Sequence, residues 1–138
     1  MLHLQGALNV KPKLLIVDDN SILRKTIRDI LESKFPALRV FEAADGKEAF
    51  IQIHNHFPNL ILMDIRLAKE NGLELTREIK TLYPQIVIII FTNYDLPEYR
   101  AAAFENGADF FYSKSSSNRQ KLTAIVKSIL AGAGSKNL

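Results

Sequence analysis

Short apolar runs recur along the chain, and a helical pattern of apolar and polar residues follows each of them. These runs have the length of β-strands, and most lack the alternation of a strand with one solvated face. A strand that is apolar at every position is buried on both faces, which is typical of a parallel sheet covered by helices. Five strands are therefore predicted, over residues 14–17, 38–41, 60–63, 86–91 and 109–112.

Prolines and glycines mark the ends of the predicted helices. Phe35, Phe57 and Tyr83 each precede a proline, and each stands between a helical segment and a strand. Because proline ends a helix and disfavours helical geometry in the residue before it, these aromatic residues are expected to be extended. Gly107 takes this place after the fourth helix, and Gly132 is expected to end the fifth. The first helix is expected to bury one face, formed by Leu23, Ile27, Ile30 and Leu31.

Strict alternation of five strands with five helices restricts the topology. Because crossovers between parallel strands are right-handed, the leading solution is an α/β fold, a doubly wound parallel sheet with helices on both faces. The expected strand order is 2-1-3-4-5, the flavodoxin-like arrangement. One domain is expected over residues 13–131, with an N-terminal extension over residues 1–12 and a tail or the start of a linker over residues 132–138.

Composition and charge narrow the class of protein. The chain has 138 residues, enough to bury a core unaided, and its lack of cysteine excludes disulfides and thiol nucleophiles. Its net charge of +3 is uneven: all fifteen acids lie within residues 14–112, whereas residues 113–138 hold five bases. We interpret those bases as a solvated helix face rather than a nucleic-acid surface. No apolar run approaches the roughly 20 residues that cross a membrane, so a cytoplasmic protein is expected, with neither membrane nor nucleic acid as a direct partner.

Polar residues end four of the predicted strands. Asp18 and Asp19 follow the first strand, Asp64 the third, Thr92 the fourth and Lys114 the fifth. Each alone is explained equally well as a cap, a turn residue or a solvated charge. Together they are expected to meet, because ligands bind outside the carboxyl ends of such strands and these four strands are neighbours. Three adjacent carboxylates need a cation, and Mg²⁺ prefers oxygen ligands; a carboxylate beside it is a credible nucleophile for a phosphoryl group.

Five separated segments resemble, in the same order, the receiver domain of response regulators. They are residues 14–20, 62–66, 72–75, 91–92 and 113–114, and the match covers about residues 13–131. The resemblance implies a phospho-acceptor module of two-component signalling, which receives a phosphoryl group from a histidine kinase or a phosphotransfer protein. It implies no enzyme activity beyond the module's own phosphorylation and dephosphorylation.

The resemblance also implies a role for each acidic residue. Asp64 matches the phosphorylated aspartate of the family. Asp18 and Asp19 match the acidic pair that organises Mg²⁺ together with Asp64, and the backbone carbonyl of Arg66 matches the remaining protein ligand.

Three further positions match the family's switch. Thr92 matches the switch hydroxyl, Lys114 the invariant lysine, and Phe111, three residues before the lysine, the switch aromatic. Phosphorylation is expected to draw Thr92 and Lys114 towards the phosphoryl group and to let Phe111 turn inwards. The change is expected at the face of the fourth helix, fifth strand and fifth helix, where partners or a second copy of the chain would bind.

The sequence departs from the family pattern in its loops. Ser115 stands where a proline, often cis, commonly follows the lysine; Ala68 stands where the loop after the third strand usually carries a proline; and Asn93 replaces a small residue. These departures bear on loop geometry and kinetics, not on the phosphorylation chemistry. Arg66 and Tyr94 are expected to overhang the phosphoryl group and hinder the approach of water, which predicts a long-lived phosphorylated form.

Other functions fit the residues less well. A receiver fold that signals without phosphate is the alternative, against which the intact acidic set argues. A flavodoxin needs a phosphate-cradling loop where Asp18 and Asp19 stand, a haloacid-dehalogenase-type phosphatase needs Asp-x-Asp there, and no P-loop motif occurs. No DNA-reading unit is expected after residue 130, and the chain fits a stand-alone receiver as well as one cut from a longer regulator.

Three further charged residues close to the predicted acidic site are not expected to take part in its chemistry. Arg24 and Arg28 share a face of the first helix, which is interpreted as solvated, with phosphate steering as the alternative. Glu42, at the end of the second strand, is expected to contribute nothing chemical.

Overall fold

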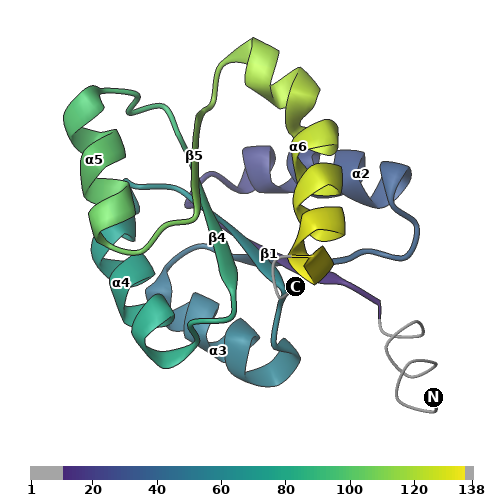
Figure 1. Ribbon diagram of the computed structural model, residues 1–138, viewed down its shortest axis with the longest axis horizontal. Coiled ribbons are helices and arrows are strands. Elements are labelled where there is room, and N and C mark those ends of the chain that lie inside the picture. Colours follow the sequence, from purple (N-terminus) through teal and green to yellow (C-terminus); the bar gives the residue numbers. More distant parts are fainter. Residues whose placement is uncertain (1–10, 136–138) are drawn as a thin grey trace.

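The computed structural model describes residues 11–135 of the chain. At its centre lies a sheet of five parallel strands in the order β2-β1-β3-β4-β5, with a helix after each strand (Figure 1). The predicted fold class and strand order are confirmed. The strands are β1 (Lys13–Val17), β2 (Arg39–Ala43), β3 (Leu60–Met63), β4 (Val87–Thr92) and β5 (Phe110–Ser113).

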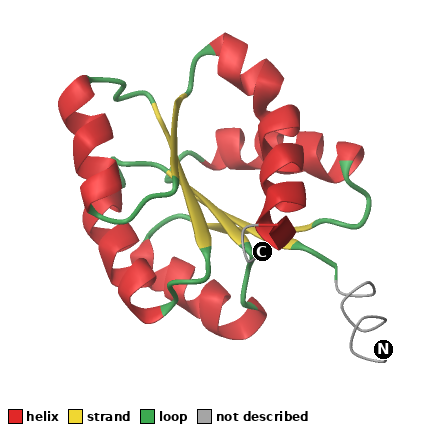
Figure 2. Cartoon of the chain, viewed as in Figure 1, coloured by secondary structure: helices red, strands yellow, loops and turns green. Residues whose placement is uncertain are grey.

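Helices cover both faces of the sheet and form the outer layers of a three-layer sandwich (Figure 2). One layer is formed by α3, α4 and α5, and the other by α2 and α6. The helices are α2 (Ser21–Lys34), α3 (Gly46–His56), α4 (Gly72–Leu82), α5 (Pro97–Glu105) and α6 (Ser116–Ser135).

Two hydrophobic cores flank the sheet, because the side chains of a strand alternate between its faces. Leu15 and Val17 of β1 pack into the core below α3, α4 and α5, whereas Leu14 and Ile16 pack into the core below α2 and α6. Strands β3 and β4 are buried at every position, as the unbroken apolar runs predicted. The centre of the sheet is thus fully buried, whereas the edge strands β2 and β5 are partly exposed.

The residues before the three prolines do not all behave as predicted. Phe35 and Tyr83 follow α2 and α4 with φ of −125° and −133°. Phe57 instead follows α3 in the left-handed region, with φ of 49°, so the expected extended geometry is wrong there. The N–H of Phe57 donates to the Ile53 carbonyl and closes the helix, and the left-handed turn then directs the chain to the buried Pro58.

Two helix predictions are also wrong. Ile30 is 39% exposed, although Ile27 and Leu31 are buried, because Ile30 lies at the edge of the stripe that α2 presents to the sheet. Gly132 lies within α6, which continues to Ser135, since a glycine inside a helix costs only about 1 kcal/mol. Residues 1–10 of the expected N-terminal extension and residues 136–138 of the expected tail lie outside the described residues.

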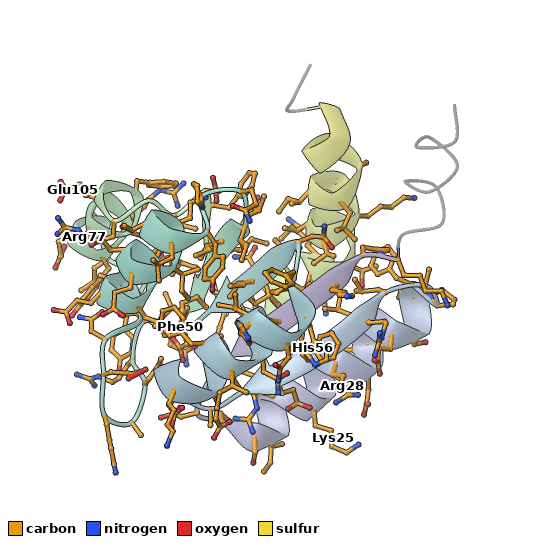
Figure 3. All side chains as sticks on the ribbon, turned by 90° about the horizontal axis from the view of Figure 1, so that it is seen from below. Lys25, Arg28, Phe50, His56, Arg77 and Glu105 are labelled. Carbon is orange, nitrogen blue, oxygen red and sulfur yellow. The ribbon has the colours of Figure 1, made fainter. Side chains whose placement is uncertain are left out.

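Buried polar groups gather at one edge of the sheet. Because all strands are parallel, their carboxyl ends lie together, and the buried polar or charged residues Asp18, Asp64, Thr92 and Lys114 all follow or end a strand there. The charged side chains of Lys25, Arg77 and Glu105, by contrast, lie on the periphery (Figure 3). Within residues 11–135, no helix combines the length and the apolar character needed to cross a membrane.

Candidate phosphoryl-acceptor site

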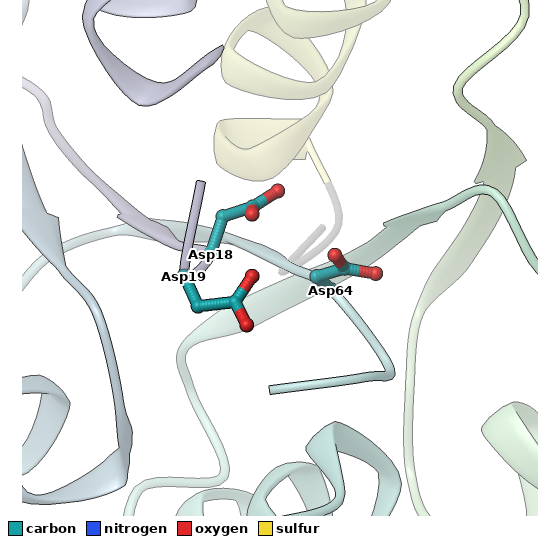
Figure 4. A group of neighbouring side chains, drawn as sticks. All are labelled: Asp18, Asp19 and Asp64. Atoms are coloured by element: carbon teal, nitrogen blue, oxygen red, sulfur yellow. The ribbon is translucent and has the colours of Figure 1, made fainter. Parts of the chain in front are cut away.

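Three carboxylates meet at the carboxyl edge of the sheet, as the sequence predicted. Asp18 and Asp19 follow β1, Asp64 follows β3, and these strands pair side by side (Figure 4). One carboxylate oxygen from each residue lies within 4.8 Å of those of the other two. Asp18 and Asp64 are 3% and 9% exposed, whereas Asp19 faces solvent. Two buried acids and one open acid make a site that a solute can reach from one side.

Lys114, which follows the edge strand β5, also contacts the cluster. Its Nζ lies 2.5 Å from Asp18 Oδ2 and 2.8 Å from Asp64 Oδ2, and its side chain is 6% exposed. The backbone N–H of Lys114 donates to the Thr92 carbonyl, which extends the β4–β5 pairing by one residue and fixes where the side chain begins. Among the described residues, the buried charged side chains are Asp18, Asp64 and Lys114, and the fold brings all three into contact.

The electrostatics of the cluster favour a further cation. Burial raises the pKa of the Asp18 carboxyl, and the hydrogen bond from Lys114 opposes that rise. Burial alone would lower the pKa of Lys114, but its hydrogen bonds to Asp18 and Asp64 outweigh burial and raise it. Lys114 thus stays charged, and one ammonium group among three carboxylates leaves negative charge uncompensated.

One oxygen of Asp64 is available to an incoming group. Asp64 Oδ1 is buried and has no hydrogen-bond partner among the described residues, while Oδ2 is held by Lys114. A buried acceptor without a partner is unfavourable, by about 1–3 kcal/mol or more for a charged group. A hard cation with oxygen ligands would satisfy it, and three neighbouring carboxylates fit such a cation. The cluster could therefore hold a metal ion of the Mg²⁺ type.

The loop after Asp64 is held close by a glycine. A side-chain Cβ at Gly72 would lie 1.9 Å from the backbone oxygen of Asp64, so only glycine fits at the first residue of α4. The Gly72 N–H donates to the Ile65 carbonyl at 2.6 Å, and the turn is closed further by a bridge between Arg66 and Asn71. This contact sets the path of the chain directly after the candidate phosphorylation residue.

Thr92 and Phe111 lie where the switch positions were expected, on the paired strands β4 and β5. Thr92 is fully buried, and its Oγ1 accepts a hydrogen bond from the Tyr94 N–H at 3.2 Å. Phe111 is 3% exposed, and the Arg100 guanidinium lies 5.5 Å from its ring centre. The Phe111 ring thus lies inwards in this structure, and the expected inward turn on phosphorylation stays a prediction.

Arg66 and Tyr94 contact each other beside the loop that follows Asp64. Arg66 Nη1 donates to the Tyr94 hydroxyl at 2.6 Å, and its guanidinium carbon lies 4.8 Å from the ring centre. Both residues line a cavity of about 250 Å³ beside the loop that follows Asp64. Among the described residues, neither side chain forms a hydrogen bond or ion pair with Asp64 itself. The two residues expected to control the lifetime of the phosphorylated form therefore contact each other, and their effect on that lifetime stays a prediction.

Ser115 gives the loop after Lys114 a different structure from a cis-proline turn. None of the described peptide bonds is cis. Ser115 Oγ accepts from the Asn118 N–H at 3.1 Å, and the Asn118 side chain donates to the Ser113 carbonyl at 3.0 Å. A serine before the first helical residue is a preferred N-cap. The departure from the family pattern thus supplies a cap for α6.

The sequence analysis missed the role of Glu42. Glu42 Oε1 lies 3.0 Å from Arg24 Nε, and Oε2 lies 3.3 Å from Arg28 Nη1. Arg24 also donates to the backbone carbonyl of Asp18, and its side chain is only 14% exposed, so the prediction of a solvated face is wrong for Arg24. The signal was available: β2 neighbours β1 in the predicted order, which brings Glu42 to the acidic turn.

Comparisons with known proteins identify the family of this chain. The family model of the response regulator receiver domain matches residues 14–127. Oxygen regulatory protein NreC from Staphylococcus haemolyticus is 33% identical over 114 residues, which cover 82% of this chain and 52% of that protein. Response regulator protein VraR from Staphylococcus aureus is 35% identical over 117 residues, which cover 83% of this chain and 55% of that protein. The chain thus spans about half the length of the curated relatives it matches.

The fold has a solved counterpart as well. A response regulator receiver domain protein (CheY-like) from Methanospirillum hungatei matches with a TM-score of 0.83 and 31% identity, over 92% of this chain and 99% of that one. Together with the family match over most of the sheet, this likeness settles the classification. The chain belongs to the family of response regulator receiver domains of two-component systems.

Proposed function

We propose that this chain is a phospho-acceptor receiver in which Asp64 takes a phosphoryl group from a phosphohistidine donor in the presence of Mg²⁺. The observation that carries the proposal is the state of the Asp64 carboxylate. One oxygen is held by Lys114, while the other is buried without a hydrogen-bond partner among the described residues, next to two further carboxylates. Such an oxygen is positioned for a new bond rather than for a structural role.

Asp18, Asp19 and Asp64 would hold the metal ion. Their oxygens supply the ligand type that Mg²⁺ prefers, and the open side at Asp19 leaves room for the water ligands that Mg²⁺ usually keeps. The backbone carbonyl of Arg66 completes the proposed set of protein ligands, by resemblance to the family. When bound, Mg²⁺ supplies charge neutralisation between the carboxylates and the phosphoryl oxygens.

The transfer step needs little chemistry from the protein. An Asp64 oxygen attacks the phosphorus of the phosphohistidine; the new O–P bond forms as the N–P bond breaks, and the imidazole leaves with the electron pair. Asp64 acts in its ionised form, so no base is required. Lys114 already lies between Asp18 and Asp64 and can transfer its hydrogen bonds to the phosphoryl oxygens without leaving the site.

The output is proposed to pass through Thr92. A phosphoryl group adds a charge of about −1.5 to −2 and strong acceptors, for which the Thr92 hydroxyl is a donor one strand away. If Thr92 Oγ1 leaves the Tyr94 N–H, the loop between β4 and α5 loses a hydrogen bond and the α5–β5–α6 face changes. Since Phe111 is already buried, we propose that phosphorylation stabilises its present position.

Partners follow from this reading of the site. A histidine kinase or a phosphotransfer protein would supply the phosphoryl group in the cytoplasm, and a downstream protein or a second copy of the chain would bind the α5–β5–α6 face. The chain would catalyse only its own phosphorylation and dephosphorylation. A phosphate-independent interaction module is the competing proposal, and it predicts the same face without any dependence on Asp64.

The test is phosphorylation by acetyl phosphate, followed by intact-protein mass spectrometry. We expect a Mg²⁺-dependent phosphoryl adduct that is absent from Asp64→Ala and present in the matched control Asp95→Ala, an exposed aspartate on the β4–α5 loop. Asp19→Ala should retain the adduct but require much more Mg²⁺. An adduct that persists in Asp64→Ala would refute the site, and none in the wild type would favour the phosphate-independent module.

A further inference from the structure

Arg24 connects the acidic turn to two neighbouring elements. Its Nε donates to Glu42 Oε1 on β2 at 3.0 Å, and its Nη1 donates to the backbone carbonyl oxygen of Asp18 at 2.5 Å. The side chain itself comes from α2 and is 14% exposed. A planar guanidinium can donate in two fixed directions at once, which a lysine ammonium does less well. Arg24 therefore fixes the turn after β1 against both α2 and β2.

The carbonyl that Arg24 contacts belongs to the peptide group between Asp18 and Asp19. Asp18 has further anchors: its N–H donates to the Ala43 carbonyl, and its Oδ1 accepts from the Asn20 N–H at 2.9 Å. Asp19 is exposed, and within residues 11–135 no hydrogen bond or ion pair reaches its carboxylate. The direction of the Asp19 side chain therefore depends on the peptide group that Arg24 orients.

Glu42 holds Arg24 in this position and provides a built-in comparison. Its second oxygen accepts from Arg28 Nη1 at 3.3 Å, and Arg28 also pairs with Glu32 at 3.3 Å. Arg28 has the same charge as Arg24, lies one helical turn away and shares the Glu42 partner. It is 42% exposed, and among the described contacts none joins it to Asp18. Of the two arginines, only Arg24 contacts the acidic turn, whereas Arg28 is more exposed and pairs with Glu32 instead.

We propose that Arg24 is a positioning residue for the metal site, that it acts by orienting the Asp18–Asp19 peptide, and that Glu42 holds it in place. The proposal rests on the proposed Mg²⁺-dependent function and adds to it two residues that do not contact the metal. Groups that orient metal ligands typically change metal affinity about 10–100-fold when they are removed.

The experiment compares Arg24→Gln with Arg28→Gln in the whole chain. Mg²⁺ is titrated into ¹⁵N-labelled protein, and the dissociation constant is read from the amide shifts of residues 18–20. We expect Arg24→Gln to weaken Mg²⁺ binding about tenfold or more. Arg28→Gln should bind Mg²⁺ no more weakly than the wild type, since it removes the same charge without touching the turn.

The sign of the effect separates positioning from electrostatics. Removing a positive charge near three carboxylates makes the local potential more negative, so electrostatics alone predicts tighter Mg²⁺ binding in both variants. Weaker binding in Arg24→Gln alone cannot arise that way. Glu42→Gln should weaken binding less, because the amide oxygen still accepts from Arg24. The part of its effect that acts through Arg24 should be absent in an Arg24→Gln background.

Each outcome decides the matter. Arg24→Gln binding as tightly as Arg28→Gln overturns the proposal but leaves the proposed function standing, whereas wild-type protein without Mg²⁺ binding overturns both. Urea unfolding in EDTA shows whether a variant is folded. If Arg24→Gln does not fold, Arg24→Lys carries the test: it keeps the charge but not the two-direction contact, so wild-type affinity in Arg24→Lys overturns the proposal and weaker affinity supports it.

Discussion

Replacing Lys114 by methionine tests how the buried charges are balanced. The substitution keeps an unbranched side chain but leaves Asp18 and Asp64 without the ammonium group that lies 2.5 and 2.8 Å from them. At about 4 Å and an effective dielectric constant near 20, each such pair attracts by roughly 4 kcal/mol before desolvation. Breaking a buried ion pair from one side costs about 3–5 kcal/mol net, because the remaining charge is uncompensated. We expect Lys114→Met to lose that amount, a large share of the 5–15 kcal/mol typical of a domain.

Urea unfolding followed by circular dichroism in EDTA measures this loss. The matched control is Lys127→Met, the same substitution at an exposed position of α6, which should change stability by no more than about 0.5 kcal/mol. Adding Mg²⁺ should stabilise Lys114→Met more than the wild type, because the metal would supply the missing positive charge. The comparison with and without Mg²⁺ therefore measures the effect of the missing charge and not that of altered packing.

The pH dependence of the stability lost in Lys114→Met provides an independent test of its electrostatic origin. Burial raises the pKa of Asp18, and in Lys114→Met the hydrogen bond that opposes this rise is lost. A carboxyl whose pKa is raised in the folded state binds its proton more tightly in the folded chain than in the unfolded one. Its ionised form therefore lowers the free energy of unfolding at neutral pH, and this loss of stability shrinks as the pH falls through the raised pKa. The gap between variant and wild type should therefore narrow in mild acid. A loss below about 1 kcal/mol, or one that neither Mg²⁺ nor acid reduces, would refute the charge-balance reasoning.

Three further outcomes are expected. The variant Arg66→Asn/Tyr94→Glu removes the contact between these two side chains. In a phosphate-release assay at fixed Mg²⁺ it should release phosphate about tenfold faster, which corresponds to about 1.4 kcal/mol in the hydrolysis barrier. Equal or slower release would end the idea of a shielded phosphoryl group. Gly72→Ala should lower the free energy of unfolding by about 1–3 kcal/mol, because its methyl group would overlap the Asp64 carbonyl, and an unchanged urea midpoint would contradict this. Ser115→Ala should cost about 1 kcal/mol through the lost cap of α6, measured as increased amide exchange in the first turn of that helix; unaltered exchange there would count against the cap.

The fold was predictable because its signals are local and repeated. Unbroken apolar runs gave the buried strands, and Asp64 and Lys114 could be placed because they directly follow such runs. Backbone detail was less accessible: Phe35, Phe57 and Tyr83 each precede a proline and each donate the closing hydrogen bond of a helix, yet of these three only Phe57 is left-handed. The contribution of Glu42 was missed because its partner, Arg24, lies on a helix whose charges look solvated in sequence.

Lys114 follows β5, which comes last in chain order among the strands of this sheet and forms one of its edges. A chain that has left the ribosome only as far as α5 can already place Asp18 beside Asp64, since β1 and β3 pair directly. It does so without the ammonium group that balances them, and the two acids repel until β5 joins β4. The order of the elements thus delays the balance of these buried charges until the whole sheet has formed.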